Sequence, residues 1–243
     1  MTRFFVASDE MQPDFFVLTG ENAKHAKVLR LKAGEEVLVC NGEGMEAICT
    51  VSDVSDGQIS LVVKKRQLSE TEAAVQVSVY MAFPKADKLE HVIQKATELG
   101  AYEIVAFPSA RCVSRPDDKS LAKKLERWQK IAASAAEQSG RGLVPKVRTL
   151  PSYKAALERA SQADKALLFY ENEQATTLKM ALASGKYRTV SLLTGPEGGL
   201  ELSEVEQAKE AGLQVCTLGK RILRCETAPL CGLSAVMYDA GEF

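Results

Sequence analysis

The hydrophobic period of the chain changes near residue 75, and this change constrains the fold more than any other feature of the sequence. After it, short runs of β-branched and apolar residues alternate with segments whose apolar side chains recur at helical spacing, beginning with 75–81 and 89–99. Such alternation predicts an α/β domain with a mainly parallel sheet and helices on both faces. Further strands are expected at 103–107, near 147, and at 166–170, 189–193 and 213–218, with a long helix across 121–135.

The first 63 residues have a β pattern instead. Asn41-Gly42-Glu43-Gly44 is a typical turn sequence between two strand-like runs. The spacing Gly42-x-Gly44-x-x-Ala47 matches the start of a dinucleotide-binding fingerprint, but strand alternation follows it, so a hairpin turn is favoured. The strand-like runs are 4–7, 15–19, 36–40, 45–51 and 58–63. Five short strands predict a small β-barrel.

One helix is expected within this first part, over 23–31. The basic side chains at its edge are Lys24, His25, Lys27 and Arg30. The polar stretch 64–74 has no hydrophobic period and separates the β pattern from the α/β pattern. The expected domains are therefore 1–68 and 75–243.

Two loops in the second domain form the predicted ligand site. Each has a glycine soon after its strand-like run, and we call them the glycine-started loops. The first, 193–199, has the sequence Leu-Thr-Gly-Pro-Glu-Gly-Gly, and the second, 218–228, begins Leu-Gly. Each follows a predicted strand, and ligands bind at such loops in open α/β sheets. Glycines let the main chain approach a ligand closely. For either loop taken alone, a tight turn without a ligand is the alternative.

The helices that follow these loops have recognisable start signals. Ser203 and Glu206 have the spacing of a capping box, which predicts a helix start at Ser203. Thr227 is expected to cap the last helix, with Pro229 in its first turn. The apolar stripe of that helix predicts packing in the core or at a subunit interface.

The chemistry of the first loop restricts the ligand. No phosphate-binding G-x-x-x-x-G-K-[ST] motif occurs, and the carboxylate of Glu197 lies within the loop. Two like charges about 4 Å apart cost roughly 4 kcal/mol at an effective dielectric constant near 20, so a polyphosphate is disfavoured. S-adenosylmethionine is a candidate, because it combines an adenine, ribose hydroxyls, an amino-acid end and a sulfonium. Another adenine-containing ligand stays open at this point.

Charge and cysteine content restrict the partners. The 31 Lys and Arg balance 32 Asp and Glu, but ten basic and four acidic residues fall between Arg111 and Arg148. Such a patch predicts phosphate binding, and a solvated helix face is the alternative. Six cysteines without a C-x-x-C pair and only two histidines indicate neither a disulfide framework nor a metal site. No signal peptide and no membrane-length apolar run is expected, which predicts a cytoplasmic protein.

Four blocks in order resemble one known family. They are 88–100, Arg127-Trp128 with 137–141, 195–199, and the loop 218–228. Together with His25 and 28–30 they are similar to the RsmE family, whose members methylate N3 of a uridine in 16S ribosomal RNA of the small subunit. The resemblance covers nearly the whole chain. Cys225 departs from it where Thr is usual, and Leu200 where Phe is common.

The resemblance implies a fold and partners. The family belongs to the SPOUT methyltransferases, so the second domain would hold a trefoil knot whose loops bind S-adenosylmethionine, and the first would be a PUA-like β-barrel that binds RNA. The enzyme would be a homodimer with the last helix at the interface, acting on 16S ribosomal RNA or the small ribosomal subunit. A non-enzymatic RNA-binding ribosome assembly factor is the alternative function.

Candidate residues follow from the loops and the resemblance together. Arg224 is predicted to steady a developing uracil anion, with Glu226 or Glu197 accepting the proton. A salt bridge between Arg224 and Glu226 that only shapes the loop is the alternative. The predicted cofactor-binding residues are Phe169, Thr194, Gly195, Gly199, Leu218, Gly219, Ile222 and Leu223. The predicted RNA-binding residues are Lys24, His25, Arg30, Arg111, Arg115, Lys123, Lys124, Arg127 and Arg141.

Overall fold

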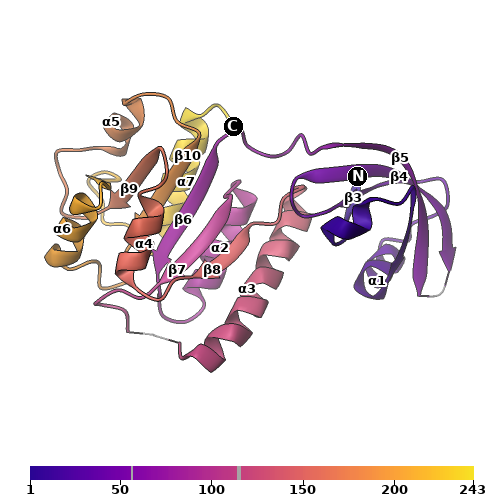
Figure 1. Cartoon of the computed structure of the whole chain (residues 1–243), viewed down its shortest axis with the longest axis horizontal. Coiled ribbons are helices and arrows are strands. Elements are labelled where there is room, and N and C mark those ends of the chain that lie inside the picture. The colour runs from indigo at the N-terminus through magenta and orange to yellow at the C-terminus, as the bar shows by residue number, and fades with distance from the viewer. Residues whose placement is uncertain (56, 114–115) are drawn as a thin grey trace. The chain divides into compact units, whose positions relative to one another are not determined.

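The computed structural model describes residues 1–55, 57–113 and 116–243, and its contacts divide the chain into two units (Figure 1). The N-terminal unit comprises 1–72 and 136–144, and the C-terminal unit comprises 73–135 and 145–243. The segment 136–144 therefore groups with the N-terminal unit although it follows the first half of the α/β pattern.

The N-terminal unit is a five-stranded sheet around one core. Its strand order is β1-β3-β4-β5-β2, in which β1 pairs with β3 in parallel and the other neighbours are antiparallel. Apolar side chains from all five strands and from α1 form a single buried cluster. The elements are β1 (Thr2–Phe5), η1 (Ser8–Met11), β2 (Phe15–Thr19), α1 (Gly20–Val28), β3 (Glu36–Cys40), β4 (Met45–Ser55) and β5 (Gln58–Leu68).

The turn between β3 and β4 is the predicted hairpin. The Asn41 side-chain oxygen accepts hydrogen bonds from the backbone N–H groups of Glu43 and Met45, at 2.8 and 3.0 Å. Gly42 and Gly44 have φ of 72° and 95°, a backbone region that glycine adopts without a steric penalty. The chain continues from this turn as strand β4, so the predicted hairpin is confirmed.

Several expected boundaries in this unit were wrong: β1 covers Thr2–Phe5 rather than 4–7, and β4 ends at Ser55 rather than at 51. β5 continues to Leu68 because the long strand β4 pairs with its polar second half, Met45 lying opposite Leu68. The stretch from 64 lacked a hydrophobic period because most of its side chains are partly or fully exposed. α1 begins at Gly20 and ends at Val28, earlier than the predicted 23–31.

The segment 136–144 is fixed within the N-terminal unit by polar contacts. The Glu72 carboxylate accepts hydrogen bonds from the Arg141 guanidinium at 2.6 Å and from the backbone N–H groups of Gly142 and Leu143. His25 lies 2.7 Å from Glu137. These contacts join residues far apart in sequence, so no periodic pattern predicted them.

The C-terminal unit contains a six-stranded sheet whose paired strands are all parallel. The order is β11-β9-β10-β6-β7-β8, so β10 lies between β9 and β6. The central strands are buried along most of their length, as the near-continuous apolar runs predicted. The strands are β6 (Gln76–Ala82), β7 (Glu103–Phe107), β8 (Lys146–Thr149), β9 (Lys165–Phe169), β10 (Thr189–Thr194) and β11 (Gln214–Cys216).

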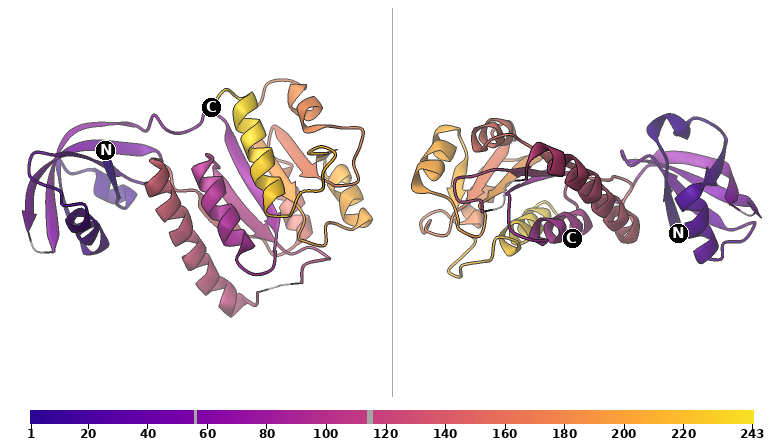
Figure 2. Two further views of the ribbon diagram at one scale, coloured as in Figure 1. Left: turned by 180° about the vertical axis from the view of Figure 1, so that it is seen from behind. Right: turned by 90° about the horizontal axis from the view of Figure 1, so that it is seen from below.

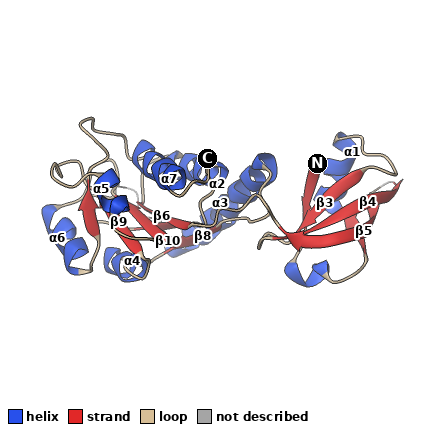
Figure 3. Ribbon diagram, turned by 90° about the horizontal axis from the view of Figure 1, so that it is seen from above, coloured by secondary structure: helices blue, strands red, loops and turns tan. Residues whose placement is uncertain are grey.

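Helices cover both faces of this sheet, which confirms the predicted α/β class. α2 and α7 lie side by side on one face, and α4 packs on the other (Figures 2 and 3). Gly100, with φ of 92°, ends the turn after α2, as expected. The helices are α2 (Lys88–Glu98), α3 (Asp118–Ser139), α4 (Tyr153–Ala160), α5 (Leu178–Ala183), α6 (Leu202–Glu210) and α7 (Thr227–Asp239).

The starts of α6 and α7 differ from the predicted ones. Glu201 is the N-cap of α6, and its backbone N–H donates to the Glu204 carboxylate at 2.9 Å. The capping box therefore lies two residues before the predicted Ser203 pair. The N-cap of α7 is Glu226, and Thr227 is already helical. Both starts have a glutamate at the N-cap, where negative charge favours the helix dipole.

Candidate functional site

The two glycine-started loops meet in one pocket at the carboxyl ends of β9, β10 and β11. The cavity has a volume of about 360 Å³, which is within the range of small-molecule sites. All eight predicted cofactor residues line it, together with Glu197 and Arg224. The pairing of β9 with both β10 and β11 brings these loops together.

Glycine is required in the first loop by close contacts. Gly199 has φ of 68°, and a Cβ there would lie 2.6 Å from Oε1 of Glu171. A Cβ on Gly195 would lie 3.0 Å from Leu200 and 3.1 Å from the Gly199 carbonyl carbon. The left-handed backbone at Gly199 and the close packing at Gly195 therefore both favour glycine in this loop.

Apolar side chains and glycine form the opposite wall. Phe169, at the end of β9, is 8% exposed and its ring packs against Gly232 of α7, where a Cβ would collide with the ring. Leu218 and Leu223 line the same cavity. Thr194 is buried and its hydroxyl donates to the carbonyl of Tyr80 at 3.3 Å, so its hydroxyl anchors the end of β10. An adenine-sized ring suits such a wall.

A charged cluster borders the pocket. The Lys88 ammonium nitrogen lies 3.1 Å from Oε1 of Glu197 and 3.2 Å from Oε2 of Glu226. The backbone N–H of Lys85 also donates to Oε1 of Glu197, at 3.0 Å. Lys88 and Cys225 line the cavity, and Glu226 lies behind them, in contact with both side chains.

The cluster holds both carboxylates ionised. Burial raises the pKa of Glu197, but the backbone N–H groups of Glu197 and Lys85 and the Lys88 ammonium outweigh burial and lower it below the ordinary range. The pKa of Glu226 is also lowered, since hydrogen bonds from its own backbone, Cys225 and Lys88 outweigh the effect of burial. Each carboxylate is therefore unprotonated at neutral pH.

Cys225 takes part in the same cluster as a neutral donor. Its thiol donates to Oε2 of Glu226 at 3.2 Å. Burial raises the pKa of this thiol to about 12, and the neighbouring carboxylates add to the effect. A hydroxyl at this position would donate in the same way, so the departure from the family pattern keeps the hydrogen bond.

The ion pair of Glu226 differs from the one considered as the alternative to its catalytic role. Among the residues that the structure describes, the ion pair of Glu226 is with Lys88, and Arg224 is exposed at the pocket rim. A loop-shaping salt bridge between Arg224 and Glu226 is thus not observed. Sequence reasoning missed Lys88 and Glu171, which also lines the pocket. The signal for Lys88 was its place at the start of the 88–100 block.

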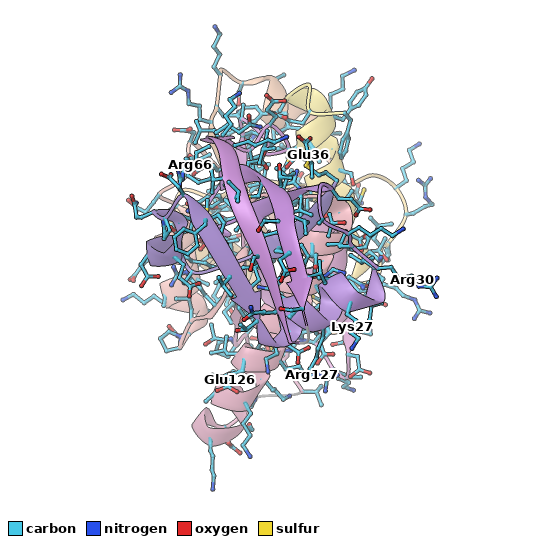
Figure 4. All side chains as sticks on the ribbon, turned by 90° about the vertical axis from the view of Figure 1, so that its right-hand side faces the viewer. Lys27, Arg30, Glu36, Arg66, Glu126 and Arg127 are labelled. Atoms are coloured by element: carbon cyan, nitrogen blue, oxygen red, sulfur yellow. The ribbon has the colours of Figure 1, made fainter. Side chains whose placement is uncertain are left out.

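The predicted RNA-binding residues fall on both units. In the N-terminal unit, Lys24 pairs with Glu21, and Lys27 and Arg30 project from the end of α1 (Figure 4). Arg141 is buried and held by Glu72, so it offers no exposed face to a nucleic acid, contrary to expectation. The burial arises because 136–144 packs in the N-terminal unit.

The C-terminal unit has further basic side chains on α3 and before it. Lys123 and Lys124 are exposed on α3, and Arg127 is 66% exposed while pairing with Glu90. The Arg111 guanidinium donates to the carbonyl of Gly198 at 3.0 Å, which connects it to the first glycine loop. The predicted Arg115 lies outside the described residues.

Neither a metal-binding group nor a membrane-spanning helix is present in the described residues. Within 1–55, 57–113 and 116–243, no group of three or more His, Cys, Asp or Glu side chains is arranged to hold a metal ion. In the same residues, none of the helices has the length and apolar character needed to cross a membrane.

The fold and the pocket together define a protein of two units, one of which is an α/β domain with a pocket suited to a small-molecule cofactor. The chain belongs to the RNA methyltransferase family, whose domain model matches residues 71–237, and an RNA methyltransferase PUA domain matches 18–64. It is therefore an RNA methyltransferase with an N-terminal PUA domain, as the four sequence blocks predicted.

The similarity to known proteins extends over almost the full chain. Ribosomal RNA small subunit methyltransferase E of Bacillus subtilis is 40% identical over 248 residues, which cover 98% of this chain and 97% of the relative. The protein of the same name from Mesomycoplasma hyopneumoniae is 34% identical over 98% of this chain and 100% of its own length. A crystal structure of a ribosomal RNA small subunit methyltransferase E from Neisseria gonorrhoeae, bound to S-adenosyl methionine, superimposes on this chain with a TM-score of 0.84. The two sequences are 31% identical, and the match covers 98% of this chain and 97% of that one.

Proposed function

We propose that the protein transfers a methyl group from S-adenosylmethionine to N3 of a uridine in 16S ribosomal RNA of the small subunit. The observation that carries the proposal is the single pocket that two distant glycine-started loops form in an RNA methyltransferase chain. The names of the relatives, ribosomal RNA small subunit methyltransferase E, support the substrate.

The pocket fits S-adenosylmethionine chemically. Gly195 and Gly199 let the main chain of the first loop line the pocket directly, and Phe169, Leu218 and Leu223 offer an apolar wall. Glu171 and Glu197 supply negative charge near the cavity, which suits a ligand with a sulfonium and an ammonium group. When bound, the cofactor supplies an electrophilic methyl group.

The residues of the chain would prepare the nucleophile. Uracil N3 carries a proton at neutral pH, so methyl transfer requires that proton to leave or the resulting anion to be stabilised. Arg224 would steady the anion, and Glu197 or Glu226 would accept the proton. The exposure of Arg224 at the pocket rim and the lowered pKa of both carboxylates, which leaves them unprotonated at neutral pH, support these roles. Because base pairing hides N3, the target uridine would be unpaired or would leave its stack on binding.

The RNA contact would use exposed basic side chains of both units. Arg141 is left out because Glu72 holds it in the interior. The exposed candidates are Lys24, Arg30, Arg111, Lys123, Lys124 and Arg127, and His25 is half-buried beside Glu137. Phosphate contacts of this kind give affinity that falls steeply with salt.

Assembly, topology and location belong to the same proposal. A homodimer with α7 at its interface is supported by the exposed Cys231 and Tyr238 on that helix. A trefoil knot in the C-terminal unit is supported by the insertion of β10 between β9 and β6. A cytoplasmic location accords with a ribosomal RNA substrate.

One experiment tests the activity directly. Small subunits that lack the modification are incubated with labelled S-adenosylmethionine and the protein, and the digested nucleosides are analysed for 3-methyluridine. Label elsewhere would refute the proposed position. The rival function, a non-enzymatic assembly factor, predicts no calorimetric binding of the cofactor at millimolar concentration.

A further inference from the structure

Lys88 occupies a position that its own helix disfavours. It is the first residue of α2, where the positive end of the helix dipole opposes a cation. The acidic residue in the same turn, Glu90, pairs with Arg127 instead. The favourable interactions of Lys88 therefore come from outside the helix.

Those interactions come from two segments that line or border the pocket. Glu197 lies in the first glycine loop and Glu226 is the N-cap of α7, and both place a carboxylate oxygen within 3.2 Å of the Lys88 nitrogen. The three side chains are between 19% and 29% exposed, so water screens their interaction only partly. One ammonium group thus joins α2, the first loop and the start of α7.

A strained turn directs this arrangement. Ala86 has φ of 53°, a left-handed conformation that a residue with a Cβ rarely adopts. The same turn aims the backbone N–H of Lys85 at Oε1 of Glu197, at 3.0 Å. Two independent groups, one on each side of Ala86, therefore converge on a single carboxylate. Strain of this kind persists where surrounding contacts require it, often at functional sites.

We propose that Lys88 is a positioning residue for methyl transfer, whose ammonium group couples the first glycine loop to the start of α7 and keeps Glu197 and Glu226 ionised together. The proposal rests on the proposed function for its catalytic consequence, but its electrostatic part concerns the chain alone. It deepens that function, because it explains how two neighbouring carboxylates remain proton acceptors.

Loss of the Lys88 charge has a defined consequence. Glu197 and Glu226 would then face each other without a cation between them, and one would bind a proton at higher pH. The other groups near the pair are the Cys225 thiol, the Lys85 backbone amide and the adjacent Arg224. The thiol is neutral and the amide carries no charge. Arg224 already stands at the exposed rim in the native protein.

The titration of the two carboxylates tests the electrostatic part. Glutamate labelled with carbon-13 at Cδ is followed by NMR against pH, and Glu197→Gln and Glu226→Gln assign the two signals. In Lys88→Met and Lys88→Gln, one signal should titrate about 1 to 3 pH units higher than in the wild type. Lys88→Arg should restore the wild-type curve. Lys95→Met is the matched control, since Lys95 lies on the same helix and pairs only with Glu98 in the described contacts. Wild-type curves in both neutral variants would overturn the proposal.

The pH dependence of methyl transfer tests the positioning role. At saturating cofactor, the acid limb of the rate profile should move to higher pH in Lys88→Met, and Lys88→Arg should bring it back. The single tryptophan, Trp128 in the C-terminal unit, reports by its fluorescence that each variant is folded. A profile in Lys88→Met that coincides with the wild type would overturn the role. If the wild-type protein transfers no methyl group, the proposed function fails, and the NMR titration alone decides whether Lys88 holds the carboxylates.

Discussion

The contact between Phe169 and Gly232 predicts a substitution that should alter the pocket from behind. A methyl group added by Gly232→Ala would collide with the Phe169 ring, which is 8% exposed and closes one wall of the cavity. Within a helix, Ala is favoured over Gly by about 0.8 to 1.0 kcal/mol. Overpacking in a close-packed region costs about 1 to 3 kcal/mol. The net effect should therefore be a destabilisation of about 0 to 2 kcal/mol.

The larger effect should be on the cofactor. If the ring moves away from α7, it moves into the space that the adenine would occupy, and each 1.4 kcal/mol of lost binding free energy is a tenfold weaker Kd. We expect S-adenosylmethionine binding by calorimetry to weaken by about tenfold or more, with a much smaller change in stability. Urea unfolding followed by Trp128 fluorescence measures the stability of the C-terminal unit itself.

A double-mutant cycle separates this steric cause from others. Phe169→Leu removes ring volume, and alone it should cost less than the roughly 3 to 5 kcal/mol of a truncation to Ala. In the double variant the new methyl group fills space that the ring has left, so the two effects should be less than additive by at least about 0.5 kcal/mol. Additive stabilities, or unchanged cofactor binding in Gly232→Ala, would refute the reasoning.

Three further results are expected. Arg224→Ala should lower the rate of methyl transfer by about 100-fold with little change in cofactor Kd, since it removes charge stabilisation from the transition state; single-turnover rates near the wild type would contradict its assignment. Arg141→Ala should destabilise the N-terminal unit by about 3 to 5 kcal/mol, because it removes the ion-pair partner of Glu72. Urea unfolding followed by circular dichroism measures this change. The control is Lys24→Ala, which removes an exposed ion pair and should cost less than about 1 kcal/mol. The folded-state pKa values of Glu197 and Glu226 are lowered, so the two ionised carboxylates should contribute their full stabilisation of the folded state above about pH 4.5. This contribution should be lost as the pH falls through the lowered values. The free energy of unfolding, followed by Trp128 fluorescence, should therefore depend less on acid pH in the Glu197→Gln, Glu226→Gln double variant.

Much of the fold was predictable because it depends on local periodicity. The alternation after residue 75 predicted the strands of the parallel sheet, since its central strands are buried on both faces and are therefore largely apolar. The glycines of the first loop predicted a ligand site, because their backbone and close contacts exclude side chains. Both features are properties of short segments.

Long-range polar contacts were not predictable in this way. Arg141 is a basic residue in a basic stretch, and only its packing against Glu72 makes it an interior group. Lys88 belongs to a helix whose buried face was predicted correctly, yet its partners lie in two other segments. A charge pattern along the sequence shows the sign of a side chain but not which distant carboxylate it meets.

The sheet order explains why these distant contacts converge on one pocket. β10 lies between β6 and β9, so the turn after β6, which contains Ala86 and leads to Lys88, stands beside the first glycine loop after β10. On the other side of β10, Phe169 at the end of β9 packs against α7. α7 is therefore held at two points, by Lys88 through Glu226 at its start and by Phe169 through Gly232 in its interior. A displacement of α7 would therefore disturb both the charged cluster and the apolar wall.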